Sequence, residues 1–100
     1  MIKHIVMWKV KGDSHDERAQ NAQKIQSAFQ GLAGKIPGLE YIEIGVDFSQ
    51  VDYAYDVVLY SEFTNYKALR DYADHPEHKR VLEELGEIRT SRCQVDYAVN

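Results

Sequence analysis

A short stretch in the second half of the chain gathers side chains that could perform acid–base chemistry. Tyr72, His75 and His78 fall within the seven residues Tyr72–His78. A neutral histidine, with an ordinary pKa of about 6.5, can remove a proton from the carbon beside a carbonyl group at neutral pH. A tyrosine hydroxyl can donate a hydrogen bond to the enolate that forms. If the protein is an enzyme, we expect residues of this stretch to act; a purely structural role at a helix break is the alternative.

The other histidines point less directly to chemistry. His75 precedes Pro76, which favours extended backbone, and we expect its side chain to stabilise the loop by a hydrogen bond. His4 lies in a predicted strand and either lines a pocket or is a hydrogen-bonded core residue. A metal site built from His4, His75 and His78 lacks a clearly placed acidic ligand. We therefore expect no metal and no other cofactor.

Length and composition exclude several classes of protein. The chain has 100 residues, a net charge of −4 and scattered basic residues. This length corresponds to a single domain, which we expect to span residues 1–100. A nucleic-acid binder would carry a basic patch, and a membrane-spanning helix needs about 20 apolar residues in a row; the sequence has neither. Cys93 is the only cysteine, so no internal disulfide can form. The first residues resemble a strand and lack the apolar core of a signal peptide, so we expect a cytoplasmic location.

Hydrophobic periodicity predicts four strands. They cover residues 2–10, 39–46, 53–63 and 92–98. The first and third are dense in apolar residues on both faces, which is typical of strands covered on both sides.

Two helices lie between these strands. The first, predicted over 16–33, begins with a capping box at Ser14–Glu17. The second begins at Thr64. Pro76 interrupts it, so that a short helix restarts over 76–85. The resulting β-α-β-β-α-β order is that of a ferredoxin-like α+β fold, with a four-stranded antiparallel sheet and the helices on one face.

The uncovered face of that sheet predicts a homodimer. Ile5, Met7, Val58 and Tyr60 would lie on the face away from the helices. A second copy of the same sheet is the simplest cover for them, so we expect a homodimer with the sheets face to face. A small-molecule ligand is the other expected partner.

Four segments resemble those of a known family. They are HIVMWK at His4–Lys9, IPGL at Ile36–Leu39, YDVVL at Tyr55–Leu59 and YADHPEH at Tyr72–His78. In this order and at this spacing they resemble the stress-responsive A/B barrel (Dabb) family over the whole chain. The His-Pro-x-His element after a tyrosine-bearing helix is the most specific part. The resemblance implies a dimeric α/β barrel made of two ferredoxin-like protomers.

The resemblance also implies which residues could act. The family includes plant stress proteins without a firm reaction and a small cofactor-free branch similar to polyketide cyclases. In that branch the tyrosine and the second histidine of the motif carry the chemistry, and these correspond to Tyr72 and His78. A histidine of the first strand corresponds to His4. We therefore predict His78 as the catalytic base and Tyr72 as its hydrogen-bond donor.

Four residues are predicted to bind the substrate. They are His4, Trp8, Arg92 and Gln94. The cyclase branch has a further histidine in the third strand, where this chain has the apolar Val57–Val58. Arg92 and Gln94 stand in the last strand, where an apolar pocket wall would be expected. These differences favour a more polar ligand.

Three functions fit the sequence, and whether the protein is an enzyme is left open. The first is a cofactor-free lyase or cyclase acting on a small carbonyl compound. The second is a non-catalytic, stress-associated oligomer. The third, by analogy with other dimeric ferredoxin-like barrels, is a cofactor-independent monooxygenase. A cavity beside Tyr72 and His78 would favour an enzyme, whereas a tightly packed interior would favour the oligomer.

Overall fold

The computed structural model describes residues 1–100 and contains four strands and three helices. In chain order they are β1 (Ile2–Val10), α1 (His15–Gln30), β2 (Leu39–Val46), β3 (Val57–Phe63), α2 (Tyr66–Ala73), α3 (Pro76–Leu85) and β4 (Arg89–Ala98). This is the predicted element order, with the second helix divided into α2 and α3. None of the helices is long and apolar enough to cross a membrane.

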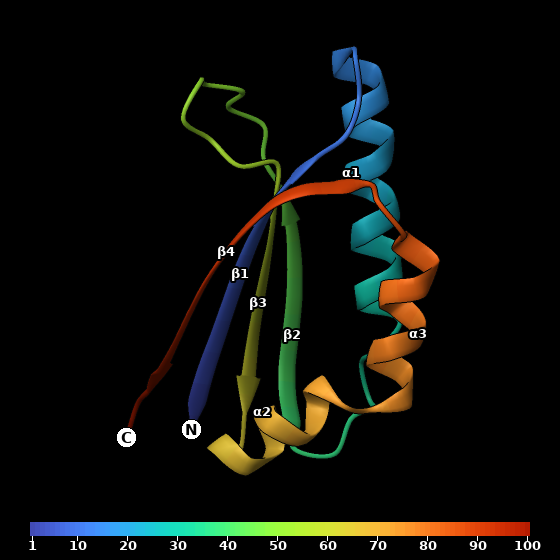
Figure 1. The fold of residues 1–100 in the computed structure, drawn as a ribbon. Coiled ribbons are helices and arrows are strands. Elements are labelled where there is room, and N and C mark those ends of the chain that lie inside the picture. Colours follow the sequence, from blue (N-terminus) through green and yellow to red (C-terminus); the bar gives the residue numbers. More distant parts are fainter.

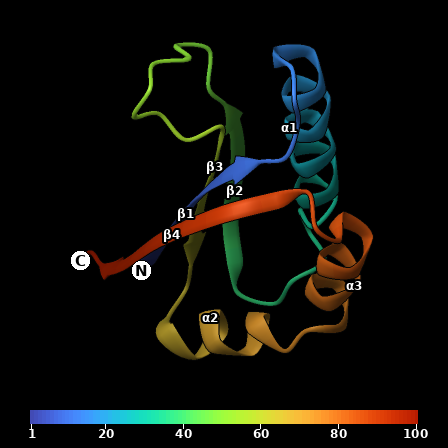
Figure 2. The same ribbon diagram turned by 45° about the horizontal axis from the view of Figure 1, so that its top comes forward.

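The four strands form one antiparallel sheet in the order β2-β3-β1-β4. All three helices lie on one face of it (Figure 1). In the turned view, α2 lies across the lower end of the sheet and α3 lies below the start of β4 (Figure 2). This arrangement confirms the predicted ferredoxin-like fold.

Alternation along each strand decides which side chains reach the helices. On β1 the helix-facing side chains are His4, Val6 and Trp8, and all three residues are buried. The register pairs them with Asp96, Gln94 and Arg92 of β4, respectively. Directly paired residues share a face of the sheet. Three polar side chains of the edge strand therefore lie on the helical side.

The apolar core lies between the sheet and the helices, as one cluster of 16 buried residues. α1 and the turns that follow it contribute five members of this cluster, each no more than 5% exposed. They are Ala22, Ile25, Phe29, Leu32 and Ile36. The ring of Phe29 stacks on that of Trp8, with centroids 5.1 Å apart. The core therefore holds α1 against the sheet, on the side of β2.

Two predicted strand boundaries are wrong. β3 begins at Val57 rather than at residue 53, because residues 47–56 form a loop. The backbone N–H of Asp47 donates to the carbonyl of Asp56 at 2.8 Å and closes this loop. β4 begins at Arg89 rather than at residue 92, because the last residue of β1 pairs with it.

Two predicted helix boundaries also differ. α1 ends at Gln30 rather than at residue 33, and the backbone N–H groups of Leu32 and Ala33 bond three residues back. The N-cap of α2 is Asn65 and not Thr64, because the Asn65 side chain accepts from the N–H of Ala68 at 2.9 Å. The Thr64 hydroxyl donates instead to the carboxylate of Glu40, at 2.6 Å.

The break between α2 and α3 follows from Pro76, which has no backbone N–H. The carbonyl of Tyr72 accepts from the N–H of His75 instead, at 3.1 Å. The His75 side chain caps α3, since its Nδ1 accepts from the N–H of Glu77 at 3.0 Å. This confirms the loop-stabilising hydrogen bond expected of His75. In a continuous helix the N–H of Glu77 would donate to the carbonyl of Ala73. Here it donates to His75, so the Ala73 carbonyl can accept a hydrogen bond from a side chain.

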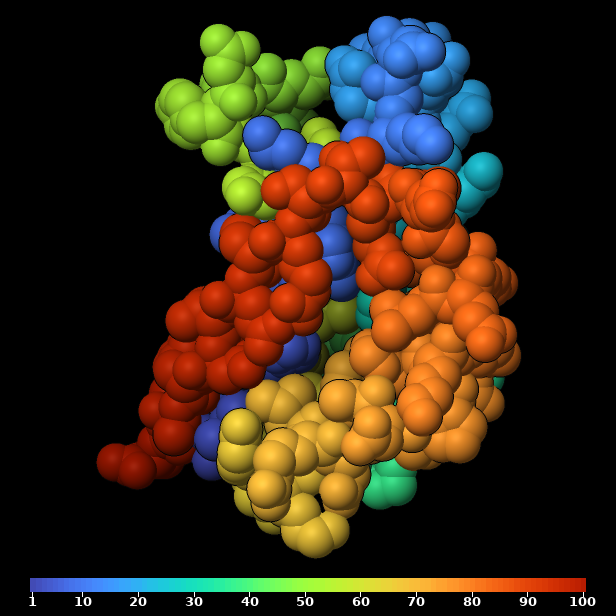
Figure 3. Space-filling model, in the orientation of Figure 1, coloured from blue at the N-terminus to red at the C-terminus, as the bar shows by residue number.

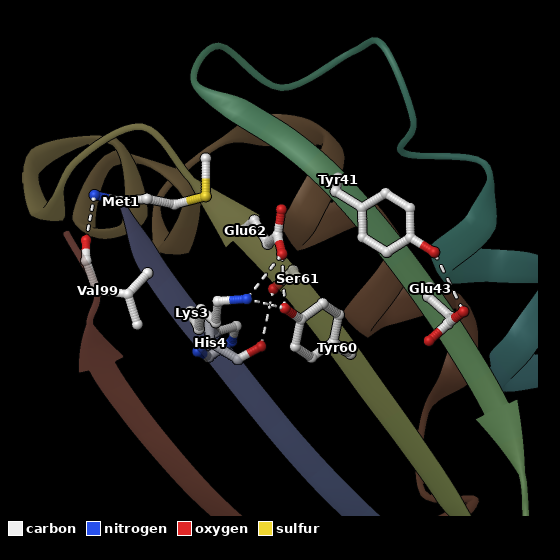
Figure 4. Close-up of polar contacts among 9 residues, drawn as sticks. All are labelled: Met1, Lys3, His4, Tyr41, Glu43, Tyr60, Ser61, Glu62 and Val99. Atoms are coloured by element: carbon white, nitrogen blue, oxygen red, sulfur yellow. Dashed lines mark hydrogen bonds and ion pairs between the residues drawn. The ribbon is translucent and has the colours of Figure 1, made fainter.

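The opposite face of the sheet carries no helix and is partly apolar. Met7, Val95 and Tyr97 are 38%, 53% and 43% exposed there. A polar network crosses the same face: Lys3 donates to the hydroxyl of Tyr60 at 2.6 Å, and both side chains bond to the Glu62 carboxylate (Figure 4).

The turn before β2 packs closely on α2 at Gly38. Gly38 has a φ of 81°, in the left-handed region. A Cβ at this position would lie 2.5 Å from the Cβ of Ala68. Gly34 has a similar φ of 78°, but its Cβ would meet nothing within 4 Å. Comparing substitutions at these two glycines therefore distinguishes the cost of backbone strain from the cost of close approach to α2.

We expect Gly38→Ala to lower the free energy of unfolding by about 2–4 kcal/mol, because it adds overpacking against α2 to left-handed strain. Gly34→Ala is the matched control and should cost about 1 kcal/mol, from strain alone. Urea denaturation of the two variants and the wild type measures both values. Equal losses would show that α2 is not held against this turn.

Candidate active site

A cavity of about 300 Å³ lies between the sheet and the helices, beside β1 and β4. It is lined by His4, Val6, Trp8, Phe29, Leu59, Tyr72, His78, Leu82, Arg89 and Arg92. Figure 3 shows the molecule hollowed between β4, in red, and α3, in orange, with atoms of β1 visible below. The lining of the cavity combines apolar core residues with two imidazoles, a phenol and two guanidinium groups. The interior beside Tyr72 and His78 is therefore open enough for a small ligand.

The register of the sheet places a carboxylate on the histidine of β1. His4 and Asp96 are directly paired, and Asp96 Oδ1 lies 2.5 Å from His4 Nδ1. A carboxylate only accepts, so Nδ1 carries the proton and Nε2 of the neutral ring has the free lone pair. The amide of Gln94 donates to the other oxygen of Asp96 at 2.8 Å. Asp96 thereby fixes the tautomer and the orientation of a ring whose side chain is only 8% exposed.

The helix break leaves the carbonyl of Ala73 without a backbone donor, and the side chain of His78 lies beside it. Its Nδ1 lies 3.2 Å from the carbonyl oxygen of Ala73. Because a carbonyl only accepts, Nδ1 carries the proton and Nε2 is the basic nitrogen. Burial lowers the pKa of His78 below its ordinary 6.5; His4, Arg89 and Arg92 lower it further, while the bond to Ala73 raises it. His78 is therefore neutral at pH 7, the form that a general base requires.

Tyr72 lies between the two histidines. Its ring centroid is 4.3 Å from that of His78 and 6.3 Å from that of His4. Burial raises the pKa of the Tyr72 hydroxyl well above its ordinary 10.0, and Arg92 acts in the opposite direction. The hydroxyl therefore keeps its proton at neutral pH and can donate it in a hydrogen bond.

The other polar part of the cavity is cationic. Arg89 and Arg92 contribute to it from β4, and neither forms an ion pair within the chain. The guanidinium carbon of Arg89 lies 5.9 Å from the centre of the Trp8 ring. Two buried donors here, Trp8 Nε1 and Arg89 Nε, have no hydrogen-bond partner. Buried donors are nearly always satisfied in folded proteins, so this end of the cavity offers two unused hydrogen bonds.

Five of the six predicted site residues line this one cavity. They are His4, Trp8, Tyr72, His78 and Arg92. Gln94 does not line it: its side chain is exposed and donates to Asp96. Gln94 therefore contacts the site only through the carboxylate that holds His4.

Two polar residues of the site, Asp96 and Arg89, were not predicted from the sequence. The alternation of Arg92, Gln94 and Asp96 along the last strand could have placed Asp96 on the same face as the other two. The contact of Asp96 with His4 depends on the register of β1 against β4, which no local pattern specifies. Arg89 was missed because the last strand was predicted to begin three residues later.

A larger groove, of about 750 Å³, runs between α1 and α3 and lacks a comparable set of groups. Arg80 and Glu84, which line it, are bonded to each other at 3.1 Å. No three His, Cys, Asp or Glu side chains of the chain are grouped so that they could hold a metal ion. The acid–base groups are thus concentrated in the smaller cavity.

Comparison with known proteins agrees with this fold. Residues 2–99 match the family described as the Stress responsive A/B Barrel Domain, Dabb. The chain belongs to this stress-responsive A/B barrel family. An uncharacterised protein of Streptomyces coelicolor is 34% identical over 80 residues, which cover 79% of this chain and 80% of that protein.

Solved structures share the ferredoxin-like fold of this chain. A dimeric protein of unknown function with a ferredoxin-like fold, from Bacteroides fragilis, is 33% identical with a TM-score of 0.85, over 98% of this chain and 95% of that one. The hydroxynitrile lyase of Passiflora edulis has a TM-score of 0.78 at 14% identity, over 99% and 93% of the two chains. At that identity the likeness to the lyase concerns the fold alone.

The pKa of His78 tests this description of the site. We expect His78 to titrate below pH 6.5, because burial and two arginines disfavour its charged ring. Arg89→Gln or Arg92→Gln removes one of those charges and should raise the pKa, while Arg70→Gln, at an exposed position of α2, is the control. NMR shifts of the histidine ring protons against pH give these values. A pKa at or above 6.5 in the wild type would contradict the burial described for this ring.

Proposed function

We propose that this A/B barrel protein is a cofactor-free enzyme of the lyase or cyclase type that acts on a small carbonyl compound. One observation carries the proposal. A protonated tyrosine, Tyr72, and a neutral histidine, His78, lie together in a cavity with ring centroids 4.3 Å apart. A hydrogen-bond donor beside a base is the arrangement that enolate chemistry needs.

In the proposed reaction, Nε2 of His78 accepts a proton from the carbon beside the substrate carbonyl. The electrons of that C–H bond form a C=C bond, and those of the C=O π bond move to the oxygen. The hydroxyl of Tyr72 donates a hydrogen bond to this oxygen and stabilises its developing charge. The enolate carbon then bonds to a second carbonyl carbon, closing a ring, or the enolate expels a leaving group from the neighbouring carbon. Protonated His78 returns its proton to the new alkoxide or to the leaving group.

His4 would hold the substrate rather than begin the reaction. With Nδ1 bound to Asp96, its Nε2 can accept a hydrogen bond from a substrate hydroxyl. Asp96 acts through His4 and is a positioning residue. Trp8 and Arg92 are the other predicted binding residues that line this cavity.

We further propose that the protein acts as a homodimer through the uncovered face of the sheet. Met7 lies on the central part of that face, on β1, and is flanked by Val58 and Cys93 on the neighbouring strands. Exposed apolar patches of this kind mark interaction surfaces. The Bacteroides fragilis relative is itself described as dimeric. A second copy of the sheet supplies a cover of matching shape and chemistry.

We expect Met7→Glu to convert a dimer into a monomer, because it would bury an unpaired carboxylate in the interface. Tyr66→Glu is the matched control, since Tyr66 is also an exposed apolar side chain, at 57%, but lies on α2 on the helical side. Sedimentation velocity of both variants and the wild type gives their masses. A monomeric wild type, or a dimeric Met7→Glu variant, would contradict this interface.

Proton–deuterium exchange tests the first chemical step without requiring the full substrate. In D₂O the protein should speed exchange of the protons beside the carbonyl of small ketones and oxo acids, followed by ¹H NMR. His78→Ala should slow this catalysed exchange by about 100-fold or more, and Tyr72→Phe by about ten-fold or more. His15→Ala is the control, because His15 is exposed at the start of α1.

The same assay has a defined dependence on pH. Only neutral His78 accepts a proton, and its pKa lies below 6.5. The rate should therefore level off at pH values well above this lowered pKa and decrease as the pH falls through it. Unchanged exchange in His78→Ala would remove His78 from the mechanism. Absence of exchange across a panel of carbonyl compounds would favour the non-catalytic oligomer.

A further inference from the structure

The cavity has a cationic end that the acid–base step does not use. Arg89 and Arg92 stand on β4 at this end, and neither has a carboxylate partner in the chain. Trp8 is 3% exposed, and its indole N–H has no acceptor. The Nε of Arg89 is likewise buried without an acceptor.

These groups lie close enough to serve one ligand. The guanidinium carbon of Arg89 is 5.9 Å from the centre of the Trp8 ring. Arg92 is paired directly with Trp8 in the sheet, and all three residues line the same hollow. The carboxylate on this face of β4, that of Asp96, already bonds to His4 and to a glutamine. The two positive charges are therefore not neutralised from within the site.

We propose that this cationic end binds a carboxylate of the substrate, so that the substrate is a small oxo acid whose carbonyl group lies at Tyr72 and His78. The carbonyl group is taken from the proposed function, on which this inference rests. A guanidinium can donate two parallel N–H bonds to the two oxygens of a carboxylate. The indole N–H of Trp8 can donate to one of the same oxygens.

The two ends of the cavity are near enough to share one small molecule. The cavity measures about 300 Å³ and is lined by both sets of groups. Arg92 lowers the pKa of Tyr72, and both arginines lower the pKa of His78. The cationic end therefore lies within electrostatic reach of the acid–base pair.

Binding can be measured without turnover, because Trp8 is the only tryptophan of the chain and its fluorescence reports on this end of the cavity. The probe is 4-oxopentanoate, which carries a ketone and a carboxylate, and 4-oxopentanamide is its uncharged counterpart. We expect a saturable change in emission with the oxo acid and at least about ten-fold weaker binding of the amide. Equal binding of the two compounds would overturn the proposal. Inorganic phosphate that displaces the oxo acid at equal concentration would also overturn it, in favour of a phosphate-bearing substrate.

Substitutions locate the binding. Arg89→Gln and Arg92→Gln should each weaken binding of 4-oxopentanoate by about ten-fold or more, and Arg70→Gln should not. Trp8→Phe keeps a ring but removes the N–H, and calorimetry should show weaker binding. If a thermal melt shows that Arg89→Gln is unfolded, Arg89→Lys serves in its place, because it keeps the charge but loses the planar pair of donors. Unchanged affinity in the folded arginine variants would overturn the assignment.

Failure of this inference is distinguishable from failure of the proposed function. If the oxo acid binds but His78→Ala exchanges protons as fast as the wild type, only the acid–base assignment fails. If exchange requires His78 but the oxo acid and the amide bind equally, only the carboxylate assignment fails.

Discussion

Pro76 lacks a backbone N–H, and the geometry of the candidate site depends on that one absent donor. α2 cannot continue past it, so the chain bends and α3 begins in a new direction. The bend leaves the carbonyl of Ala73 to the imidazole of His78, and this bond decides which ring nitrogen is basic. In an unbroken helix, residues six positions apart point in different directions. The break instead brings the ring of Tyr72 against that of His78.

The antiparallel register of β1 and β4 is the second constraint, and it organises the polar groups on the opposite wall. Pairing of His4 with Asp96 gives a buried imidazole its carboxylate, and pairing of Trp8 with Arg92 brings a guanidinium to the indole. Both pairs lie on the helical side, because side chains of paired residues share a face. A shift of the register by one residue would send either set to the other side of the sheet. The edge strand therefore contributes most of the charge of the site.

The two faces of the sheet serve different purposes in this arrangement. The helical face holds the apolar core, and core residues such as Val6, Phe29 and Leu59 line part of the cavity. Low polarity there accounts for the direction of both pKa shifts, since burial disfavours the charged forms of His78 and Tyr72 alike. The other face carries Met7 and further exposed apolar side chains, which a second copy of the sheet would cover.

The sequence by itself determined the order of the strands and helices, the helix break at Pro76 and the candidate pair of Tyr72 and His78. The order and the break depend on local periodicity and on the covalent structure of proline, whereas the pair was indicated by residue type and by the resemblance to the A/B barrel family. Only the tertiary structure decided that Asp96 holds His4 and that Arg89 reaches Trp8. His4 and Asp96 are 92 positions apart, and their contact exists only because two strands pair in one register. The start of β3 was also decided at long range, because the apolar residues before Val57 satisfy a strand pattern locally but belong to a loop closed by backbone pairing of its two ends.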